Sequence, residues 1–473
     1  MNDYEMTIGI ECHVQLATKT KLFSPADNDA REATPNSKVH PIDFGLPGML
    51  PVLNREAIVI AIKAAKALNA EVAKVSRFDR KHYFYPDLPK GYQITQMYQP
   101  TILEGYVDVP VQDEIVRVRI HHAHIEEDAG KLIHSSDHSL VDLNRAGTPL
   151  IEIVSEPDIH SAEVAREYAT ELYRLMTYAE VTQGDLYHGN MRFDVNISAA
   201  KKGSKELGTR TEVKNLNSFR SVEKAAEYEF KRQVELLEKG EKVIQETRGW
   251  DDAKQKTISQ RSKEDAQDYR YMPDADIPPI VLTDDYVTDI QSIVPILTPE
   301  YRHRFTKLDV DRSVINTVLA ERQYAELLLA VLEKGGITSA KRVANWIASN
   351  LEAEYTNEQK SFASVEDFIS LSAMVDGAEV SSNAASKLFN LLMNGKGDPY
   401  ALAKERNLLQ VSDEGEIITV VEAVLADSKS AKAIEDIKNG NDKAIGFLVG
   451  QVMARSKGKS NPAVAQKLIR ERL

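Results

Sequence analysis

Residues 121–131 read His-His-Ala-His-Ile-Glu-Glu-Asp-Ala-Gly-Lys, and this stretch organises the interpretation of the rest of the chain. It brings three histidines and three consecutive acids together in a chain that holds only 11 histidines. It follows residues 115–120, whose alternating apolar and basic side chains predict a β-strand. If no bulge interrupts this strand, four side chains are expected on one face: Arg117, Arg119, His121 and Glu127.

Two interpretations of this stretch remain open from its own residues. A dense group of titratable side chains at a strand end suits a divalent cation and a phosphate. A solvated loop that begins after a strand would carry the same charges without any bound ligand. Matching polar groups on other predicted strands favour the first interpretation.

Polar faces recur on further predicted strands. Residues 7–16 alternate so that Glu11 and His13 project from one side, about 7 Å apart. Glu152 lies within an apolar run, where a carboxylate is costly unless it is paired or binds a metal ion. Two more strands carry polar groups on one face: Arg192, Asp194 and Asn196 within residues 192–198, and Arg210, Glu212 and Lys214 within residues 210–215.

If these strands are neighbours, their polar side chains meet in one cradle. Carboxylates would hold a divalent ion, and Lys214, Arg192 or Lys81 would neutralise phosphate oxygens. Phosphoryl transfer requires this arrangement, because it depends mainly on positioning and charge stabilisation. The chain contains neither a Walker A loop nor a Gly-x-Gly-x-x-Gly motif, so the common nucleotide-binding folds are not supported.

Basic and aromatic residues interleave between residues 77 and 92. Lys81 and Lys90, for example, alternate with aromatic side chains that include Tyr83. Aromatic rings stack on bases and basic groups contact phosphates, so this pattern is typical of nucleotide or RNA binding. Tyr and Phe also fill protein cores, which keeps a purely structural interpretation open.

Composition and charge limit the function further. The 473 residues carry a formal charge of −13, so most of the surface is not suited to nucleic acid. The single cysteine, Cys12, excludes a disulfide framework or a thiolate zinc site and fits a reducing cytoplasm. No apolar run approaches the ~20 residues of a membrane span, and the acidic N-terminal residues do not predict a signal or transit peptide. We therefore expect a cytoplasmic protein with no membrane association.

The order of predicted elements indicates an α+β fold in three parts. Strands and flanking helices fill residues 1–294, where we expect a mixed or antiparallel sheet that forms the cradle. Strand patterns end near residue 295, so an all-helical domain is expected over residues 295–408 and a small helical tail over residues 409–473. Residues 429–473 contain ten Lys or Arg against four Asp or Glu, which is typical of a surface that binds a polyanion.

Several long motifs resemble one protein family, and together they span the whole chain. They are Ile8-Gly-Ile-Glu-Cys-His-Val-Gln-Leu, Phe78-Asp-Arg-Lys-His-Tyr-Phe-Tyr-Pro-Asp, His124-Ile-Glu-Glu-Asp-Ala-Gly-Lys, Asp142-Leu-Asn-Arg-Ala-Gly-Thr-Pro-Leu-Ile-Glu-Ile-Val-Ser-Glu-Pro-Asp, Glu212-Val-Lys-Asn-Leu-Asn-Ser and Gly446-Phe-Leu-Val-Gly-Gln-Val-Met. The chain resembles the B subunits of aspartyl/glutamyl-tRNA(Asn/Gln) amidotransferases. The resemblance implies ATP-dependent phosphorylation of the side-chain carboxylate of Glu-tRNA(Gln) or Asp-tRNA(Asn). Ammonia then displaces the phosphate, which makes the enzyme a glutamine-dependent carbon–nitrogen ligase.

The resemblance also implies cofactors, partners and residue roles. ATP and Mg2+ are the expected cofactors, and a glutaminase A subunit, a small C subunit and the misacylated tRNA are the expected partners. Metal ligands are expected at Glu11, His13, Glu126, Glu127 and Glu152. Catalytic roles are expected for Glu127, Glu152, Lys81 and Lys214. ATP or phosphate binding is expected at Lys81, Tyr83, Arg192, Asp194, Asn196 and Lys214. In the tail, tRNA contacts are expected at Lys443, Arg455, Lys457 and Lys459.

One segment departs from the family pattern. Many relatives bind zinc through cysteines in the segment that corresponds to residues 24–44, whereas this segment carries Ser24 and Ala26 and no cysteine. We therefore expect no zinc site. No amidase signature is present either, so the ammonia is expected to come from a partner.

Two alternative functions remain open. A non-catalytic tRNA-binding scaffold would have no use for a buried carboxylate such as Glu152. A stand-alone metal hydrolase is disfavoured by the basic tail and by the lack of a hydrolytic motif.

Overall fold

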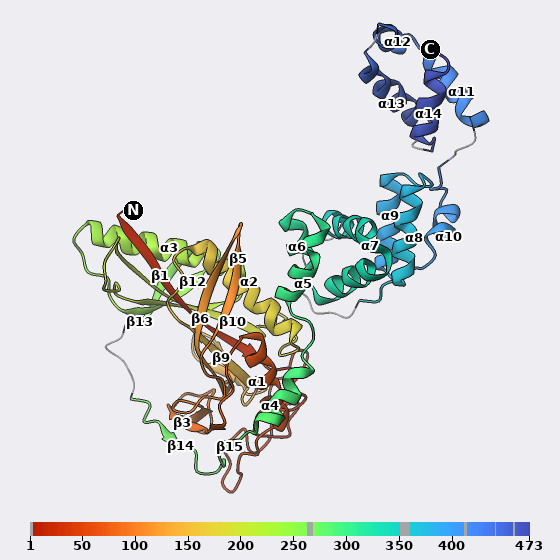
Figure 1. Cartoon of the computed structure of the whole chain (residues 1–473). Coiled ribbons are helices and arrows are strands. Elements are labelled where there is room, and N and C mark those ends of the chain that lie inside the picture. Colours follow the sequence, from red (N-terminus) through yellow and green to blue (C-terminus); the bar gives the residue numbers. More distant parts are fainter. Residues whose placement is uncertain (1–2, 263–267, 351–359, 411–413, 440, 457–458) are drawn as a thin grey trace. The chain divides into compact units, whose positions relative to one another are not determined.

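The computed structural model describes residues 3–262, 268–350, 360–410, 414–439, 441–456 and 459–473. The chain divides into two compact units, one built from Met1–Glu300 and the other from Tyr301–Glu354 and Glu358–Leu473. Figure 1 shows strands and helices mixed in the first unit and helices in the second. The prediction of an α+β fold is confirmed, while the division into three domains at residues 294 and 408 stays a prediction.

Eight strands form the main sheet of the first unit, in the order β13-β12-β11-β10-β1-β9-β6-β5. Neighbouring strands are antiparallel except β11 and β12, which run parallel. Strands far apart in the sequence therefore lie side by side. Their bounds are β1 Tyr4–Gln15, β5 Gly105–Val111, β6 Glu114–Glu127, β9 Pro149–Ser155, β10 Met191–Lys201, β11 Thr211–Leu216, β12 Glu246–Asp251 and β13 Lys256–Ser262.

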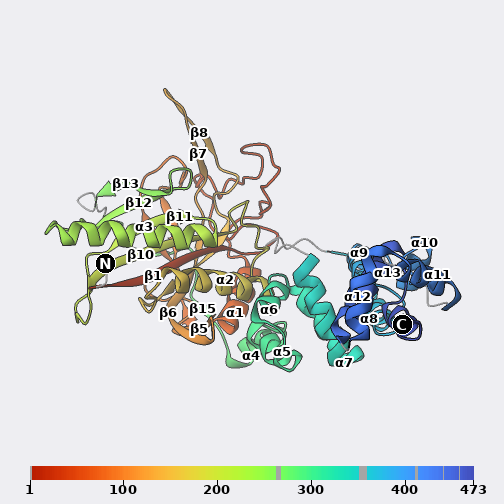
Figure 2. The ribbon, with the colours of Figure 1, turned by 90° about the horizontal axis from the view of Figure 1, so that it is seen from above.

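Smaller sheets and helices surround the main sheet. The small sheets are β14-β3-β4 (β3 Asp79–His82, β4 Tyr92–Thr95, β14 Met272–Pro273), β15-β2 (β2 Val75–Ser76, β15 Ile280–Val281) and β7-β8 (β7 Lys131–His134, β8 Ser139–Asp142). The helices are α1 Arg55–Ala67, α2 Ala162–Tyr178, α3 Phe219–Glu238 and α4 Asp284–Ser292, while the next helix, α5 Thr298–Phe305, begins in the first unit and ends in the second. Helices α2 and α3 lie side by side and share one hydrophobic core with the main sheet (Figure 2).

The alternation of β1 fixes which face of the sheet meets this core. Ile8, Ile10, Cys12 and Val14 are fully buried, and the residues between them face the other way, including Glu11 and His13 on one side as predicted. Cys12 is therefore a packed core residue. The burial of one face leaves the opposite face of β1 and its neighbours free to carry polar groups.

Local sequence signals mark the start of α2 and the end of α3. Helix α2 begins after Ser161, whose hydroxyl accepts a hydrogen bond from the backbone N–H of Val164 at 3.1 Å, as an N-cap residue does. Gly240, with a φ of +75°, follows the end of α3 in the left-handed conformation that favours glycine. Both features are local signals that stand in the sequence itself.

A bulge in β6 changes which residues face the cradle. The strand register shifts between Ile120 and His122, so Ile120 and Ala123 both face the core. The prediction that Glu127 shares a face with Arg117, Arg119 and His121 is therefore wrong. Beyond the bulge, the even-numbered residues take the polar face: His122, His124 and Glu126.

The second unit is helical in its described residues. Its helices are α6 Arg312–Val318, α7 Arg322–Asn350, α8 Val365–Asp376, α9 Ser382–Met393, α10 Pro399–Glu405, α11 Glu414–Leu425, α12 Ala431–Lys438, α13 Ile445–Arg455 and α14 Pro462–Arg470. The last four helices share a hydrophobic cluster of their own. Among the described residues, no helix combines the length and the apolar character that crossing a membrane requires.

Candidate active site

Four neighbouring strands place polar side chains in one row across the sheet. In the strand register, His124 of β6 lies opposite Glu152 of β9, and Glu152 lies opposite His13 of β1. His13 in turn lies opposite Arg192 of β10. Because paired residues project from the same face of a sheet, these side chains gather on the face opposite the core.

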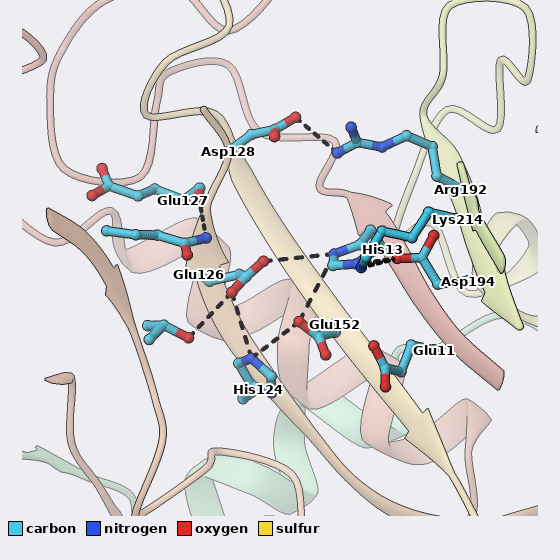
Figure 3. Close-up of polar contacts among 12 residues, drawn as sticks. Glu11, His13, His124, Glu126, Glu127, Asp128, Glu152, Arg192, Asp194 and Lys214 are labelled. Carbon is cyan, nitrogen blue, oxygen red and sulfur yellow. Dashed lines mark hydrogen bonds and ion pairs between the residues drawn. The ribbon is translucent and has the colours of Figure 1, made fainter. Parts of the chain in front are cut away.

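The centre of this row is a cluster of two carboxylates and two histidines, Glu126, Glu152, His13 and His124 (Figure 3). His13 Nδ1 lies 3.6 Å from Glu126 Oε1 and 3.9 Å from Glu152 Oε2. His124 Nε2 lies 3.5 Å from Glu126 Oε2 and 3.6 Å from Glu152 Oε2. The ligand atoms of His13, Glu126 and Glu152 all lie within 4.8 Å of one another, close enough to hold one metal ion. We call these four residues the carboxylate–histidine cluster.

A second group of acids lies beside the cluster on β1, β10 and β11. Oxygen atoms of Glu11, Asp194 and Glu212 also lie within 4.8 Å of one another. Lys214 Nζ donates to Asp194 Oδ2 at 2.9 Å and lies 2.8 Å from Glu212 Oε1, while Asn196 Nδ2 donates to Glu11 Oε1 at 2.9 Å. His13 Nε2 lies 3.9 Å from Asp194 Oδ2, so this residue touches both groups.

The charges of the cluster hold one another in place. Burial opposes a positive charge on His13, but the neighbouring Glu126 and Glu152 carboxylates raise its pKa to about 9. Burial likewise opposes the charge of Glu126, yet its contacts with His124 and His13 hold the pKa of Glu126 well below its ordinary value. A buried carboxylate that stays ionised is suited to exchange its histidine partner for a cation.

Glu127 lies outside the cluster, although the sequence predicts it as a metal ligand and a catalytic residue. Its side chain points away from His13 (Figure 3) and its Oε2 accepts a hydrogen bond from Lys90 Nζ at 2.6 Å. The backbone N–H of Ile94 donates to Glu127 Oε1 at 2.9 Å. Both charged side chains of this pair are almost fully buried. The bulge in β6 accounts for this, since it turns Glu127 away from the polar face.

We expect Glu127→Gln to destabilise the fold, because it leaves the buried Lys90 without a counter-charge. Breaking a buried ion pair by removing one partner costs about 3 kcal/mol. Urea denaturation of the full chain measures this loss of unfolding free energy. Adding Lys90→Met to the same variant removes the unpaired charge and should restore most of the stability. Equal stability of Glu127→Gln and the wild-type chain would contradict the structural role of this pair.

Two further predicted phosphate-binding residues border the cluster. Lys81 of β3 has its ammonium 4.8 Å from the ring centre of Tyr269 and 6.0 Å from that of Tyr83, and it forms no ion pair within the described residues. Arg192 donates from Nη2 to Asp128 Oδ2 at 3.0 Å. Its Nε is buried without a hydrogen-bond partner among the described residues. Both cations therefore keep donors available for an anion.

Comparisons with known proteins identify the family. A sequence profile described as the GatB/GatE catalytic domain matches residues 6–288, and a profile described as the GatB domain matches residues 326–473. The chain belongs to the family of amidotransferase B subunits. It is 43% identical over 479 residues to the B subunit of the aspartyl/glutamyl-tRNA(Asn/Gln) amidotransferase of Persephonella marina, with 100% of both chains covered. The relative from Carboxydothermus hydrogenoformans carries the same name and is 41% identical over 486 residues, which cover 100% of this chain and 99% of the relative.

Family membership confirms the predicted role as part of a tRNA-dependent amidotransferase, a carbon–nitrogen ligase, and it disfavours the non-catalytic scaffold. The catalytic-domain profile covers the strands that carry both acidic groups, so these groups lie within the part of the chain that carries the family's chemistry. The roles of individual residues in this family member remain predictions.

The donor set of the cradle fits the predicted Mg2+ at most positions. Carboxylate oxygens from Glu126, Glu152 and Glu11 are hard ligands of the kind that Mg2+ prefers. The nitrogen of His13 is the exception, because imidazole is more typical of softer ions. Acids gathered on neighbouring strands, with the basic side chains beside them, could thus hold a divalent cation together with a phosphate.

Several residues of this region were missed or placed less well by sequence reasoning. His124 was overlooked as a member of the cluster, and the signal was its position two residues before Glu126 on the same strand face. Thr95 of β4 was also missed: its hydroxyl donates to Glu126 Oε2 at 3.2 Å, a contact that only the packing of β4 on β6 reveals. The ring centre of Tyr83, a predicted phosphate-binding residue, lies 6.0 Å from the Lys81 ammonium.

The predicted tRNA-binding residues of the tail divide into three cases. Lys443 and Lys459 are exposed and form no ion pair within the described residues. Arg455, at the end of α13, forms an ion pair with Asp427. Lys457 lies outside the described residues. The structure therefore leaves Lys443 and Lys459 as the described members of this set best placed to meet a polyanion.

Proposed function

We propose that this chain phosphorylates the side-chain carboxylate of a misacylated tRNA and then amidates it. The oxygen of the Glu or Asp carboxylate attacks the γ-phosphorus of ATP, which yields an acyl phosphate and releases ADP. Ammonia attacks the acyl carbon, the carbon–oxygen bond to phosphate breaks, and inorganic phosphate leaves with the amide formed. The substrates are Glu-tRNA(Gln), Asp-tRNA(Asn) or both.

One observation supports this proposal most directly. Buried carboxylates and basic side chains that keep unused hydrogen-bond donors lie close together around one face of the sheet. Glu126 is held ionised inside the fold by a depressed pKa, which a binding scaffold has no reason to maintain. Lys81 and Arg192 offer free donors beside it. A phosphate with its cation is the ligand that satisfies both kinds of group.

Roles for the cradle residues follow from these contacts. Glu126, Glu152, His13 and Glu11 would hold Mg2+, which neutralises charge on the phosphate oxygens of ATP when it is bound. Lys81 and Arg192 would contact the phosphates through their free donors. Asp194 and Glu212 hold the Lys214 ammonium within the second acidic group, and Asn196 orients Glu11. Glu127 would act as a positioning residue, because it fixes Lys90 and the backbone of β4 behind the cluster.

Ammonia would come from a partner protein in the cytoplasm. The only thiol of the chain, Cys12, is fully buried, and burial raises its pKa well above the ordinary value, so it is unsuited to attack glutamine. We therefore propose a heterotrimer with a glutaminase A subunit and a small C subunit.

The direct test supplies the purified full chain with ATP, Glu-tRNA(Gln) and one nitrogen donor. With ammonium chloride we expect Gln-tRNA(Gln), ADP and phosphate in equal amounts. With glutamine alone we expect no amide until the A and C subunits are added. Amide formation from glutamine by the chain alone would contradict the proposed division of labour. The absence of any ATP-dependent amide with ammonium, even in the complete complex, would refute the proposed reaction.

We expect the double variant Lys443→Ala/Lys459→Ala to bind tRNA more weakly than the wild-type chain. Each lost phosphate contact lowers the slope of log affinity against log salt by about one unit. Filter binding of tRNA at several salt concentrations measures both affinity and slope. Lys239→Ala, at an exposed position after α3, is the matched control. An unchanged salt slope in the double variant would argue against the tail as a tRNA-binding surface.

A further inference from the structure

A row of four tyrosines lies beside the carboxylate–histidine cluster. Tyr83, Tyr269, Tyr271 and Tyr98 follow one another at ring-centre distances of 6.2, 6.1 and 6.4 Å, and each neighbouring pair packs edge to face. We call them the tyrosine row. They come from three separate segments of the chain, so the row exists only in the folded protein. Because the rings meet edge to face, large parts of their flat surfaces are left uncovered by one another.

A cation–ring contact, the pairing of β3 with β4 and two side-chain hydrogen bonds link the tyrosine row to the cluster. Lys81 of β3, whose ammonium lies over the Tyr269 ring, pairs with Gln93 of β4. The side chain of Gln93 donates to the carbonyl of Glu127 at 2.8 Å, and Thr95 of the same strand donates to Glu126. The rings therefore stand one small sheet away from the proposed phosphorylation site. Figure 1 shows this sheet, with β3 beside β14, next to the lower part of the main sheet.

The outer end of the row is a rigid, exposed platform. Tyr98 is 62% exposed, and its neighbour Met97 is 54% exposed. Both backbone N–H groups donate to the buried carboxylate of Asp79, at 2.9 Å for Met97 and 3.1 Å for Tyr98. The buried Asp79 thus fixes the backbone that carries the exposed ring of Tyr98. Phe84 and Tyr85, which follow Tyr83, add two more exposed rings.

Uncompensated positive charge accompanies the rings. Arg77 and Arg270 are exposed and, like Lys81, form no ion pair within the described residues. The backbone N–H of Arg77 donates a hydrogen bond to the carbonyl of Gln99, the residue after Tyr98. Arg270 lies between Tyr269 and Tyr271 in the sequence. Flat rings alternating with free cations suit a single-stranded nucleic acid, whose bases stack while its phosphates meet the cations.

We propose that the tyrosine row binds the unpaired 3′ nucleotides of the aminoacylated tRNA. This inference rests on the proposed function, because the reacting amino acid is esterified to the terminal ribose and must bring that end of the RNA to the cluster. A row of several rings, with its outer members exposed, matches successive bases. The adenine of ATP is a single base and would need only one ring.

The test compares the binding of two short RNA hairpins to the full chain. One hairpin carries a 3′ tail of four unpaired nucleotides, and the other lacks the tail. We expect the wild-type chain to prefer the tailed hairpin, and Tyr98→Ala to lose about tenfold in affinity for it, the scale of one lost base–aromatic stack. Tyr98→Phe keeps the ring and should bind within about twofold of wild type. The trimmed hairpin should bind equally well to all three proteins.

Two controls separate the alternatives. Tyr187→Ala removes a ring that is 91% exposed elsewhere in the first unit and should leave the preference for the tail unchanged. Affinity for ATP, measured by calorimetry, should be unchanged in Tyr98→Ala. Unaltered binding of the tailed hairpin would overturn the inference, as would a loss confined to ATP. Because binding is measured without any reaction, a failure of the tyrosine row is distinguishable from a failure to amidate.

Discussion

Replacing Glu126 with glutamine is expected to slow formation of the acyl phosphate by at least about 100-fold. Glu126 contacts both histidines of the cluster, each through a different carboxylate oxygen, and it is a proposed ligand of the divalent ion. Glutamine keeps the size but removes the charge, and the loss of one group that stabilises developing negative charge costs ~10²-fold or more. The rate is measured as ADP release that depends on Glu-tRNA(Gln), with no ammonia donor present.

The fold should survive this change. His13 and His124 can release a proton when the Glu126 charge is lost, because contact with that carboxylate is among the causes that raise the pKa of each ring. Glu114→Gln, at the exposed start of the same strand, is the matched control and should react at the wild-type rate. A Glu126→Gln chain that forms the intermediate at the normal rate would remove the cluster from the phosphorylation site.

We expect Lys81→Met to produce the second large effect, again about a 100-fold slower phosphoryl transfer. The ammonium of Lys81 has no ion-pair partner within the described residues, so its charge is available to a phosphate. Methionine preserves the unbranched side chain whose end lies near the rings of Tyr83 and Tyr269. Single-turnover transfer from radiolabelled ATP, with the ADP-forming rate read directly, measures the loss.

Lys74→Met is the control for this variant. Lys74 is exposed and already pairs with Asp284 at 3.1 Å, so its loss should leave transfer unchanged. Thermal unfolding of both variants should match that of the wild-type chain, because neither lysine carries a buried ion pair. If Lys81→Met transfers phosphate as fast as Lys74→Met, Lys81 does not contact the reacting phosphates.

Much of the fold was predictable because its signals are local. The period-two alternation of Ile8, Ile10, Cys12 and Val14 set the core face of β1, and the Ser161 hydroxyl marked the start of α2. The order of the strands was not predictable in this way. Nothing near β1 in the sequence specifies β9 and β10 as its neighbours, because pairing depends on contacts between distant segments.

In the candidate site, too, the local features were predictable and the features set by distant contacts were not. Glu11 and His13 were recognised from a strand face and Glu152 from its place within an apolar run, and the register brings them together. The bulge after Ile120 has no clear signal in the sequence, and it exchanged the places of Glu126 and Glu127 relative to the polar face. The pairing of Glu127 with Lys90 joins residues 37 positions apart, so only the folded chain reveals it.

The most direct test of the proposed site is to locate the divalent ion itself. Crystals of the amidotransferase complex grown with Mn2+ and a non-hydrolysable ATP analogue would give an anomalous difference map at the manganese absorption edge. The account predicts a peak within bonding distance of Glu126 and Glu152, with the analogue's phosphates against Lys81 and Arg192. An analogue bound elsewhere, with no manganese between these carboxylates, would contradict it.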